Sequence, residues 1–267
     1  SSPFQFSVNN AIKKSIGISG DKLYEDFKES LNNGYSLLTN NIIKSRSNAN
    51  IITDKGTANL HPTWSPDGKK VSYISNADND FFGQTDLFIY DVDSGEGKNI
   101  KRNVISSPSW NNDGSVIYYS KRAKYPNKYG SRYFDLYEYH FDEEKENRLT
   151  IDARAFSPCF IPTDSSLVYL ATYDGGQNIF HINLTTRKTQ KLTNYTDRSM
   201  ISNLSFDEYN NRLLFDITRN HFRDIAYLSF EDSVLGYLFE NKEWDERDAD
   251  ISAGKIIYSD DRSGIFN

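Results

Sequence analysis

The sequence is poor in sulfur and in long apolar runs, and both absences narrow what the chain can be. It has one cysteine, Cys159, and one methionine in 267 residues. One cysteine cannot form an intrachain disulfide or a cluster of thiolate metal ligands. No apolar run approaches the roughly 18 residues of a membrane-spanning helix, so we expect no transmembrane segment. The chain begins without an initiator Met or the apolar segment of a signal peptide, so we expect a mature or excised piece.

Several common catalytic and metal-binding motifs are also missing from the sequence. No histidine lies in the H-E-x-x-H pattern of a zinc peptidase, and the chain has no G-x-S-x-G nucleophile elbow and no D-x-D-x-D-G calcium loop. We therefore predict that the chain is not an enzyme and has no catalytic residue, metal site or cofactor. The four scattered histidines are His61, His140, His181 and His221.

The composition favours strands and disfavours nucleic acid as a partner. Hydrophobic residues make up only 37% of the chain, yet 14% of it is aromatic, so the core must be built largely from Tyr, Phe and Trp. Aromatic residues are enriched in strands. The formal net charge of -6 argues against nucleic-acid binding through bulk positive charge, although a local basic patch remains compatible with it.

A repeat runs through most of the sequence. The triplet Pro62-Thr63-Trp64 recurs as Pro108-Ser109-Trp110 and Pro158-Cys159-Phe160, at spacings of 46 and 50 residues. A weaker copy follows at 202–204, and a degenerate one begins at Ile251. Each triplet precedes a polar turn and an apolar strand pattern. In the first two copies the turn contains an Asp-Gly pair, which suits a tight hairpin because Gly supplies the positive φ.

The segments between the triplets complete a four-stranded unit. Second apolar strands are predicted at 86–92, 135–141, 178–184 and 224–230, and closing strands at 98–104, 147–151 and 190–194. Four strands in about 45 residues are typical of a β-propeller blade. We predict an all-β propeller of four full blades and a partial fifth. Trp64 and Trp110 are expected on innermost strands, wedged between neighbouring blades.

The repeat sequences also resemble a known family. PTWSPDGKKVSYIS, FGQTDLFIYDV and YGSRYFDLYEYHF resemble the TolB-like, WD-related propeller repeat, over roughly residues 49–267. Together they look like the propeller of large bacterial envelope proteins in which a TolB-like domain follows a peptidase MA-like domain. The resemblance implies a periplasmic or cell-envelope location and a six-bladed parent. We therefore expect this chain to be part of a larger polypeptide, with the segment ANIITD, 49–54, as the outer strand of an incomplete blade.

The N-terminal residues predict a helix rather than a blade. IGISGDKLYEDFKESLNNGY, 16–35, reads as a capped amphipathic helix. We divide the chain into a helical segment, 1–45, and a propeller, 46–267, that is incomplete at its C-terminus. The helix is either the tail of a preceding peptidase-like domain or an ordinary extension packed beside the propeller. We expect the helix to start at Ser19 or Asp21 and to stop at Gly34. Its expected apolar face consists of Leu23, Phe27 and Leu31.

The richest candidate for partner binding is the loop at 121–132, KRAKYPNKYGSR, which has five basic residues and no acidic one. Basic and tyrosine side chains together favour capture of an acidic peptide or protein segment. One alternative is a solvated loop whose charges offset Asp78, Asp80 and Asp248. Another is that Arg132, Arg154 and Arg223 form structural ion pairs with Asp135, Asp152 and Asp224. The candidate residues are Lys121, Arg122, Lys124, Tyr125, Lys128, Tyr129, Arg132, Arg154 and Arg223.

Two functions remain open at this point. The first is a non-catalytic propeller that binds or scaffolds a protein or peptide in the bacterial cell envelope. The second is an accessory domain that gates substrate for a zinc or serine peptidase whose active site lies outside this chain.

Overall fold

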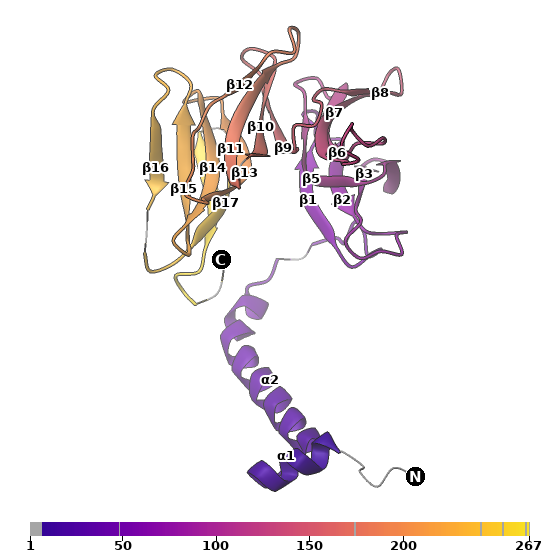
Figure 1. The fold of residues 1–267 in the computed structure, drawn as a ribbon. Helices are drawn as coiled ribbons and strands as arrows, with labels where there is room; N and C mark the ends of the chain where they lie inside the picture. The colour runs from indigo at the N-terminus through magenta and orange to yellow at the C-terminus, as the bar shows by residue number, and fades with distance from the viewer. Residues whose placement is uncertain are drawn as a thin grey trace. The chain divides into compact units, whose positions relative to one another are not determined.

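The computed structural model describes residues 7–47, 49–173, 175–240, 242–252, 254–264 and 266 (Figure 1). Contacts divide the chain into two compact units, Ser1–Ile51 and Ile52–Asn267. The first unit is helical and the second is built from strands. Neither helix in the described residues is both long and apolar enough to cross a membrane.

The first unit consists of helices α1, Val8–Ile16, and α2, Gly20–Lys44. The side chain of Ser19 caps α2 by accepting a hydrogen bond from the Lys22 amide at 3.2 Å, so Ser19 rather than Asp21 is the N-cap. The predicted stop at Gly34 is wrong. A helix that ends at Gly usually does so with that Gly in the left-handed conformation, whereas Gly34 has no positive φ and α2 continues to Lys44. Helix α1 was not predicted.

In its described residues, the second unit contains four four-stranded antiparallel sheets and one two-stranded sheet, which we call blades 1 to 5. In every four-stranded blade, sequential strands are hydrogen-bonded neighbours. The first strands of successive blades contact one another, β1 with β5, β5 with β9, β9 with β13 and β13 with β17. This arrangement confirms the predicted propeller with four full blades and a partial fifth. The bounds are β1 Asn59–Trp64, β2 Lys70–Ser75, β3 Asp86–Asp91 and β4 Glu96–Lys101; β5 Val104–Trp110, β6 Val116–Arg122, β7 Phe134–His140 and β8 Lys145–Arg148; β9 Ala155–Ile161, β10 Ser166–Tyr173, β11 Gly176–Asn183 and β12 Thr189–Lys191; β13 Met200–Asp207, β14 Arg212–Arg219, β15 Phe222–Ser229 and β16 Leu235–Phe239; β17 Glu246–Ser252 and β18 Lys255–Asp260.

Each inner strand carries a bulge at the same place in the repeat. The ladder between the first and second strand shifts register there in all five blades. A non-glycine residue with positive φ occupies each bulge, a conformation that ordinarily costs free energy. Its recurrence shows that the bulge belongs to the repeat. The five residues are His61, Ser106, Ser157, Asn203 and Asp248.

The Asp-Gly pairs form hairpins, as predicted. Gly68 and Gly114 have φ of +71° and +73°. An oxygen of Asp67 accepts from the Ser65 hydroxyl and the Lys69 amide at 2.6 and 3.1 Å, which lowers the pKa of this carboxyl. Asp113 also accepts from an amide and a hydroxyl, both from Ser115, at 2.9 and 2.6 Å. These aspartates are therefore committed to the turns between first and second strands.

Apolar side chains fill the spaces between blades, and the anchor of each triplet lies in them. Trp110 of blade 2 is buried against blade 1, and Phe160 of blade 3 stacks on Tyr118 of blade 2 with ring centroids 5.7 Å apart. Trp64 departs from this expectation, since 62% of it is exposed. The face of blade 1 that carries Trp64 has no blade packed on it within the described residues.

Two strand predictions need correction. The segment 49–54 forms no strand in its described residues; instead Thr53 hydrogen-bonds Tyr73, on the face of blade 1 that also carries Trp64. An outer strand needs a neighbouring strand to pair with, and none pairs with this segment within the described residues. The closing strands end earlier than predicted, at Lys101, Arg148 and Lys191, because the chain must turn toward the next inner strand.

Candidate functional site

The longest connections between the second and third strands lie at one end of blades 1 and 2. These connections span 76–85 in blade 1 and 123–133 in blade 2. In blades 3 and 4 only two residues separate the corresponding strands. Loops carried by a rigid scaffold are common places for binding residues. The shape of this end therefore differs from blade to blade, and blades 1 and 2 supply most of the variable surface.

The loop at 123–133 is held in shape by Asn127. Its side-chain oxygen accepts hydrogen bonds from the amides of Tyr129 and Ser131 at 3.0 and 3.1 Å, and its Nδ2 donates to Asp152 at 3.1 Å. The Ala123 amide also donates to the Tyr133 carbonyl at 2.9 Å. The loop is thus braced internally and against the connection that follows β8.

Two lysines of this loop lie against their neighbouring tyrosines. The Lys124 Nζ is 5.2 Å from the Tyr125 ring centroid, and the Lys128 Nζ is 4.9 Å from that of Tyr129. Both rings face solvent, with 71% and 77% of Tyr125 and Tyr129 exposed. These two cation–π pairs place positive charge and aromatic area together on the surface.

Arg154 joins this loop from the start of β9. Its Nη2 donates to the Tyr133 hydroxyl at 3.0 Å, and its guanidinium lies 4.4 Å from the Tyr133 ring centroid. The hydrogen bond from Arg154 is the main reason that the pKa of Tyr133 is lowered. Arg132, the remaining cation of the loop, is exposed.

Two of the nine candidate residues, Lys121 and Arg223, bond to residues outside the 123–133 loop. The Lys121 Nζ forms an ion pair with both oxygens of Glu146, at 2.9 and 2.8 Å, and only 20% of its side chain is exposed. Arg223 lies in β15 of blade 4, where its amide donates to Asp245 at 3.0 Å and its Nε lies 3.4 Å from the Thr218 hydroxyl. Neither side chain is brought together with the tyrosines of the 123–133 loop.

In two of the three ion pairs considered as alternatives, Arg132–Asp135 and Arg154–Asp152, one member bonds to a different partner. Asp135 is fully buried and accepts from Arg148 Nη2 at 2.6 Å rather than from Arg132. Asp248 pairs with its neighbour Arg247 at 3.4 Å. Arg154 donates to Tyr133 instead of pairing with Asp152. The cations of the loop therefore keep much of their charge available to solvent.

Two exposed phenylalanines in the neighbouring loop were not predicted from the sequence. Phe81 and Phe82 follow β2 and are 70% and 74% exposed. The signal was present as an apolar pair inside the polar segment NADNDFFGQ. We use the name "loop surface" for the exposed cations and aromatic residues at this end of blades 1 and 2, namely Phe81, Phe82, Arg122, Lys124, Tyr125, Lys128, Tyr129, Arg132 and Arg154. Two acids, Asp78 and Asp80, are also exposed in the 76–85 loop.

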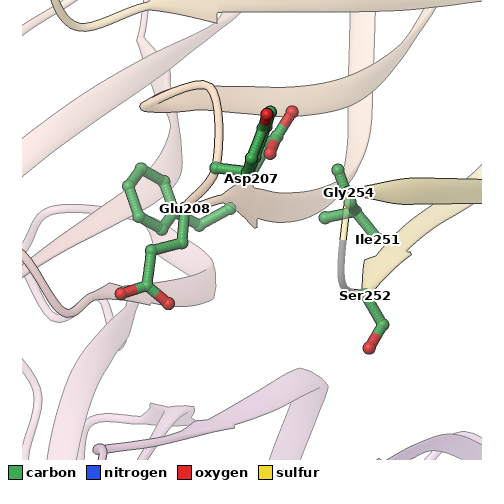
Figure 2. Close-up of a pocket in the computed structure, with 7 residues that line it drawn as sticks. Asp207, Glu208, Ile251, Ser252 and Gly254 are labelled. Carbon is green, nitrogen blue, oxygen red and sulfur yellow. The ribbon is translucent and has the colours of Figure 1, made fainter.

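A second concave region lies at the opposite end of the blades, between blades 4 and 5 (Figure 2). Its volume is about 450 Å³, and Asp207 is its buried acid. Asp207 accepts from Arg212 Nε at 2.8 Å and from Asn210 Nδ2 at 2.7 Å, so it is occupied by its own turn. Figure 2 shows the Glu208 carboxylate directed away from Ile251. This region therefore brings no pair of acids together for catalysis.

No catalytic or metal constellation is evident in the part of the chain that the structure describes. Within these residues, no group of three His, Cys, Asp or Glu side chains could hold a metal ion. Burial raises the pKa of the Cys159 thiol to about 12, so a reactive thiolate is disfavoured at neutral pH.

Comparison with known proteins identifies the fold as that of a TolB-like β-propeller. No family model matches the chain, and no curated protein matches it in sequence. Among solved structures, it is similar to TolB from Acinetobacter baumannii, with 14% identity, a TM-score of 0.56 and 76% of this chain covered. It is also similar to a putative TolB from Agrobacterium tumefaciens, with 16% identity, a TM-score of 0.58, and 70% of this chain and 68% of that one covered. The chain spans 51% of the length of the Acinetobacter protein.

A propeller domain from a protease is similar as well. The β-propeller domain of the Trilobed protease from Pyrococcus furiosus shares 15% identity at a TM-score of 0.51, with 76% of this chain and 63% of that one covered. That domain is described as having an open velcro topology. At these identities the likeness concerns the fold alone, and the fold occurs in TolB proteins and in peptidases alike.

Proposed function

We propose that this chain is a non-catalytic propeller that binds a protein or peptide segment through the loop surface. The observation that carries the proposal is the braced loop at 123–133, which holds Lys124 and Lys128 against two exposed tyrosines. Tyrosine and arginine are enriched in binding interfaces, and a preformed loop loses little conformational entropy on binding. The surface is therefore suited to a partner rather than to a reaction.

The charge of the loop surface favours an acidic partner. Its members include five cations, against two exposed acids, Asp78 and Asp80, in the same pair of loops, whereas the chain as a whole has a formal net charge of -6. Complementary charge raises association rates and excludes partners of the same sign. An acidic peptide or protein segment is the class of ligand that this surface selects.

A location in a bacterial envelope, within a larger protein, is part of the same proposal. The similarity to two TolB structures supports it, as does the motif resemblance of the repeats. The exposed indole of Trp64 supports a further packed segment on blade 1, because the equivalent Trp110 is buried by its neighbouring blade.

The second candidate function is an accessory domain of a peptidase. The similarity to the propeller domain of the Trilobed protease favours it. An H-E-x-x-H or G-x-S-x-G motif in a longer reading frame would support this alternative. Incubation of the purified chain with a peptide library is expected to yield binding without cleavage, and cleavage that persists through purification would overturn the non-enzyme proposal.

Charge reversal tests the binding proposal. The double variant Arg122→Glu, Lys124→Glu should lose capture of envelope proteins from a bacterial extract. The matched control, Lys69→Glu with Lys188→Glu, makes the same change in net charge at turns on the opposite end of the blades. Equal capture by both variants and the unmodified chain would count against the loop surface.

A further inference from the structure

A small pocket lies where the loop surface crosses from blade 1 to blade 2. Phe81 and Gln84 come from the loop that follows β2, and Arg122 and Phe134 from the facing ends of β6 and β7. Its volume is about 160 Å³. That is smaller than the roughly 300–1,000 Å³ of pockets that enclose a drug-sized ligand, and it suits a single side chain or chain terminus. The lining is Phe81, Gly83, Gln84, Thr85, Asn103, Ile105, Arg122 and Phe134.

Arg122 is the only ionised group among the residues that line this pocket. It is paired across the ladder with Phe134, and its guanidinium lies 5.1 Å from the Phe134 ring centroid. An arginine stacked on a ring keeps its N–H donors available at its edge, and these donors match a carboxylate in geometry. The side chain is exposed, so an incoming ligand can reach it.

Three acids adjoin the pocket walls in sequence, and two of them are turned inward and satisfied. The third, Asp80 beside Phe81, is exposed and forms no ion pair with Arg122 among the described residues. Asp86 is buried and accepts from Asn99 Nδ2 and the Asn103 amide, both at 2.9 Å. Asp135 is buried and accepts from Arg148, at 2.6 Å, and from the Thr150 hydroxyl, at 2.8 Å. These bonds direct neither of the two buried carboxylates to Arg122, so neither of them neutralises the guanidinium.

Apolar surface flanks the cation. The Phe81 ring forms one wall, and the exposed Phe82 follows it. A carboxylate beside an apolar residue would therefore meet both features at once. A fully hydrated acidic stretch would gain only the charge interaction, which salt weakens at an exposed site.

We propose that this pocket anchors the partner by receiving one carboxylate at Arg122, with an adjacent apolar residue of the ligand packed on Phe81. The inference rests on the proposed binding function and names the anchor within it. The carboxylate comes from an Asp or Glu side chain or from a free C-terminus. Arg122 is the specificity-determining residue, and Phe81 supplies apolar contact.

Three fluorescent N-acylated peptides test the pocket by fluorescence anisotropy. They are Gly-Phe-Glu-Phe-Gly as the amide, Gly-Phe-Gln-Phe-Gly as the amide, and Gly-Phe-Gln-Phe-Gly as the free acid. We expect one or both carboxylate peptides to bind, and the Gln amide to bind about 10-fold more weakly or worse, since a charge-assisted hydrogen bond is lost. Binding of the Glu amide identifies a side-chain source, and binding of the free acid alone identifies a terminal one.

Variants separate the pocket from general binding. Arg122→Gln should weaken binding of the preferred peptide about 10-fold. Phe81→Ala should also weaken its binding, whereas the control variant Lys69→Gln should leave the binding unchanged. Failure of both carboxylate peptides to bind at millimolar concentration, or equal binding by Arg122→Gln, overturns the carboxylate pocket. Charge reversal at Lys124 and Lys128 could abolish partner capture while Arg122→Gln leaves it intact. That result would overturn the anchor at Arg122 and leave the proposed binding function standing.

Discussion

The indole Nε1 of Trp110 donates a hydrogen bond to the Ser72 hydroxyl at 3.0 Å, across the interface between blades 1 and 2. Trp64 has the same place in blade 1, since it is paired with Val71 as Trp110 is paired with Ile117. The two differ in burial, with 62% of Trp64 and 6% of Trp110 exposed. The same repeat position is therefore buried by a neighbouring blade at Trp110, whereas at Trp64 no neighbouring blade covers it within the described residues.

This difference predicts unequal costs for matched substitutions. Trp110→Phe should lower the free energy of unfolding by about 1 kcal/mol through the lost hydrogen bond, and Trp110→Ala by about 3–5 kcal/mol through the cavity. Trp64→Phe should change it by less than about 0.5 kcal/mol. Urea unfolding followed by circular dichroism measures all three, and equal losses at the two positions would contradict the interface assigned to Trp110.

Lys121 and Lys124 should behave differently although both belong to the basic segment. Lys121 forms an ion pair with Glu146, which also accepts a hydrogen bond from the buried Tyr119 hydroxyl. Lys121→Met should therefore cost about 1–3 kcal/mol of unfolding free energy by leaving the carboxylate underpaired, and the exposed Lys124→Met should cost almost nothing. A double-mutant cycle with Glu146→Gln checks whether the loss at Lys121 comes from this pair.

Asp216 predicts a pH dependence of stability. Burial raises the pKa of this carboxyl to about 7 from its ordinary 3.8, although the hydrogen bond from the Asp248 amide opposes the rise. The folded chain then holds the proton more tightly than the unfolded chain, so the contribution of Asp216 to stability falls as the pH rises from about 4 to about 7.

Asp216→Asn removes that titration and keeps an oxygen for the Asp248 amide, which donates to Asp216 at 3.0 Å. The variant should gain stability relative to the unmodified chain as the pH rises from 5 to 8. Unfolding titrations at both pH values supply the comparison. A constant difference between the two proteins would show that the carboxyl stays ionised in the fold.

Asn127 should control the order of the 123–133 loop. Asn127→Ala removes the acceptor for the Tyr129 and Ser131 amides and the donor to Asp152. Limited trypsin digestion should then cut faster after Lys124 and Lys128. Asn183→Ala, which removes an acceptor for the amides of Thr185 and Thr186, is the control, and it should leave these two cleavage rates unchanged.

The blade count and the turns could be predicted from the sequence because they repeat. The Pro-x-Trp triplets and Asp-Gly turns of blades 1 and 2, and the period that continues through the later blades, reflect local backbone needs of the repeat. What could not be predicted depends on contacts between distant segments. Lys121 looked like a free loop cation because its partner, Glu146, lies two strands away in the sheet.

Local patterns also failed where no neighbour reinforces them. Gly34 could not end α2 by itself, since a helix stops only where the backbone leaves helical dihedrals and caps its carbonyls. The segment 49–54 has strand-forming residues but no ladder to join. Phe81 and Phe82 were overlooked because an apolar pair in a loop predicts neither helix nor strand, and only the fold places Phe81 beside Arg122.

The most direct test of the central claim, that partners bind at the loop surface, is site-specific photo-crosslinking. A benzoylphenylalanine replaces Tyr125 in one variant and Tyr209, an exposed tyrosine at the opposite end of the blades, in another. After irradiation in bacterial envelope extract, we predict a discrete crosslinked band from position 125 that disappears with Arg122→Glu and Lys124→Glu. A band from position 209 alone, or a band from 125 that survives charge reversal, would contradict the account.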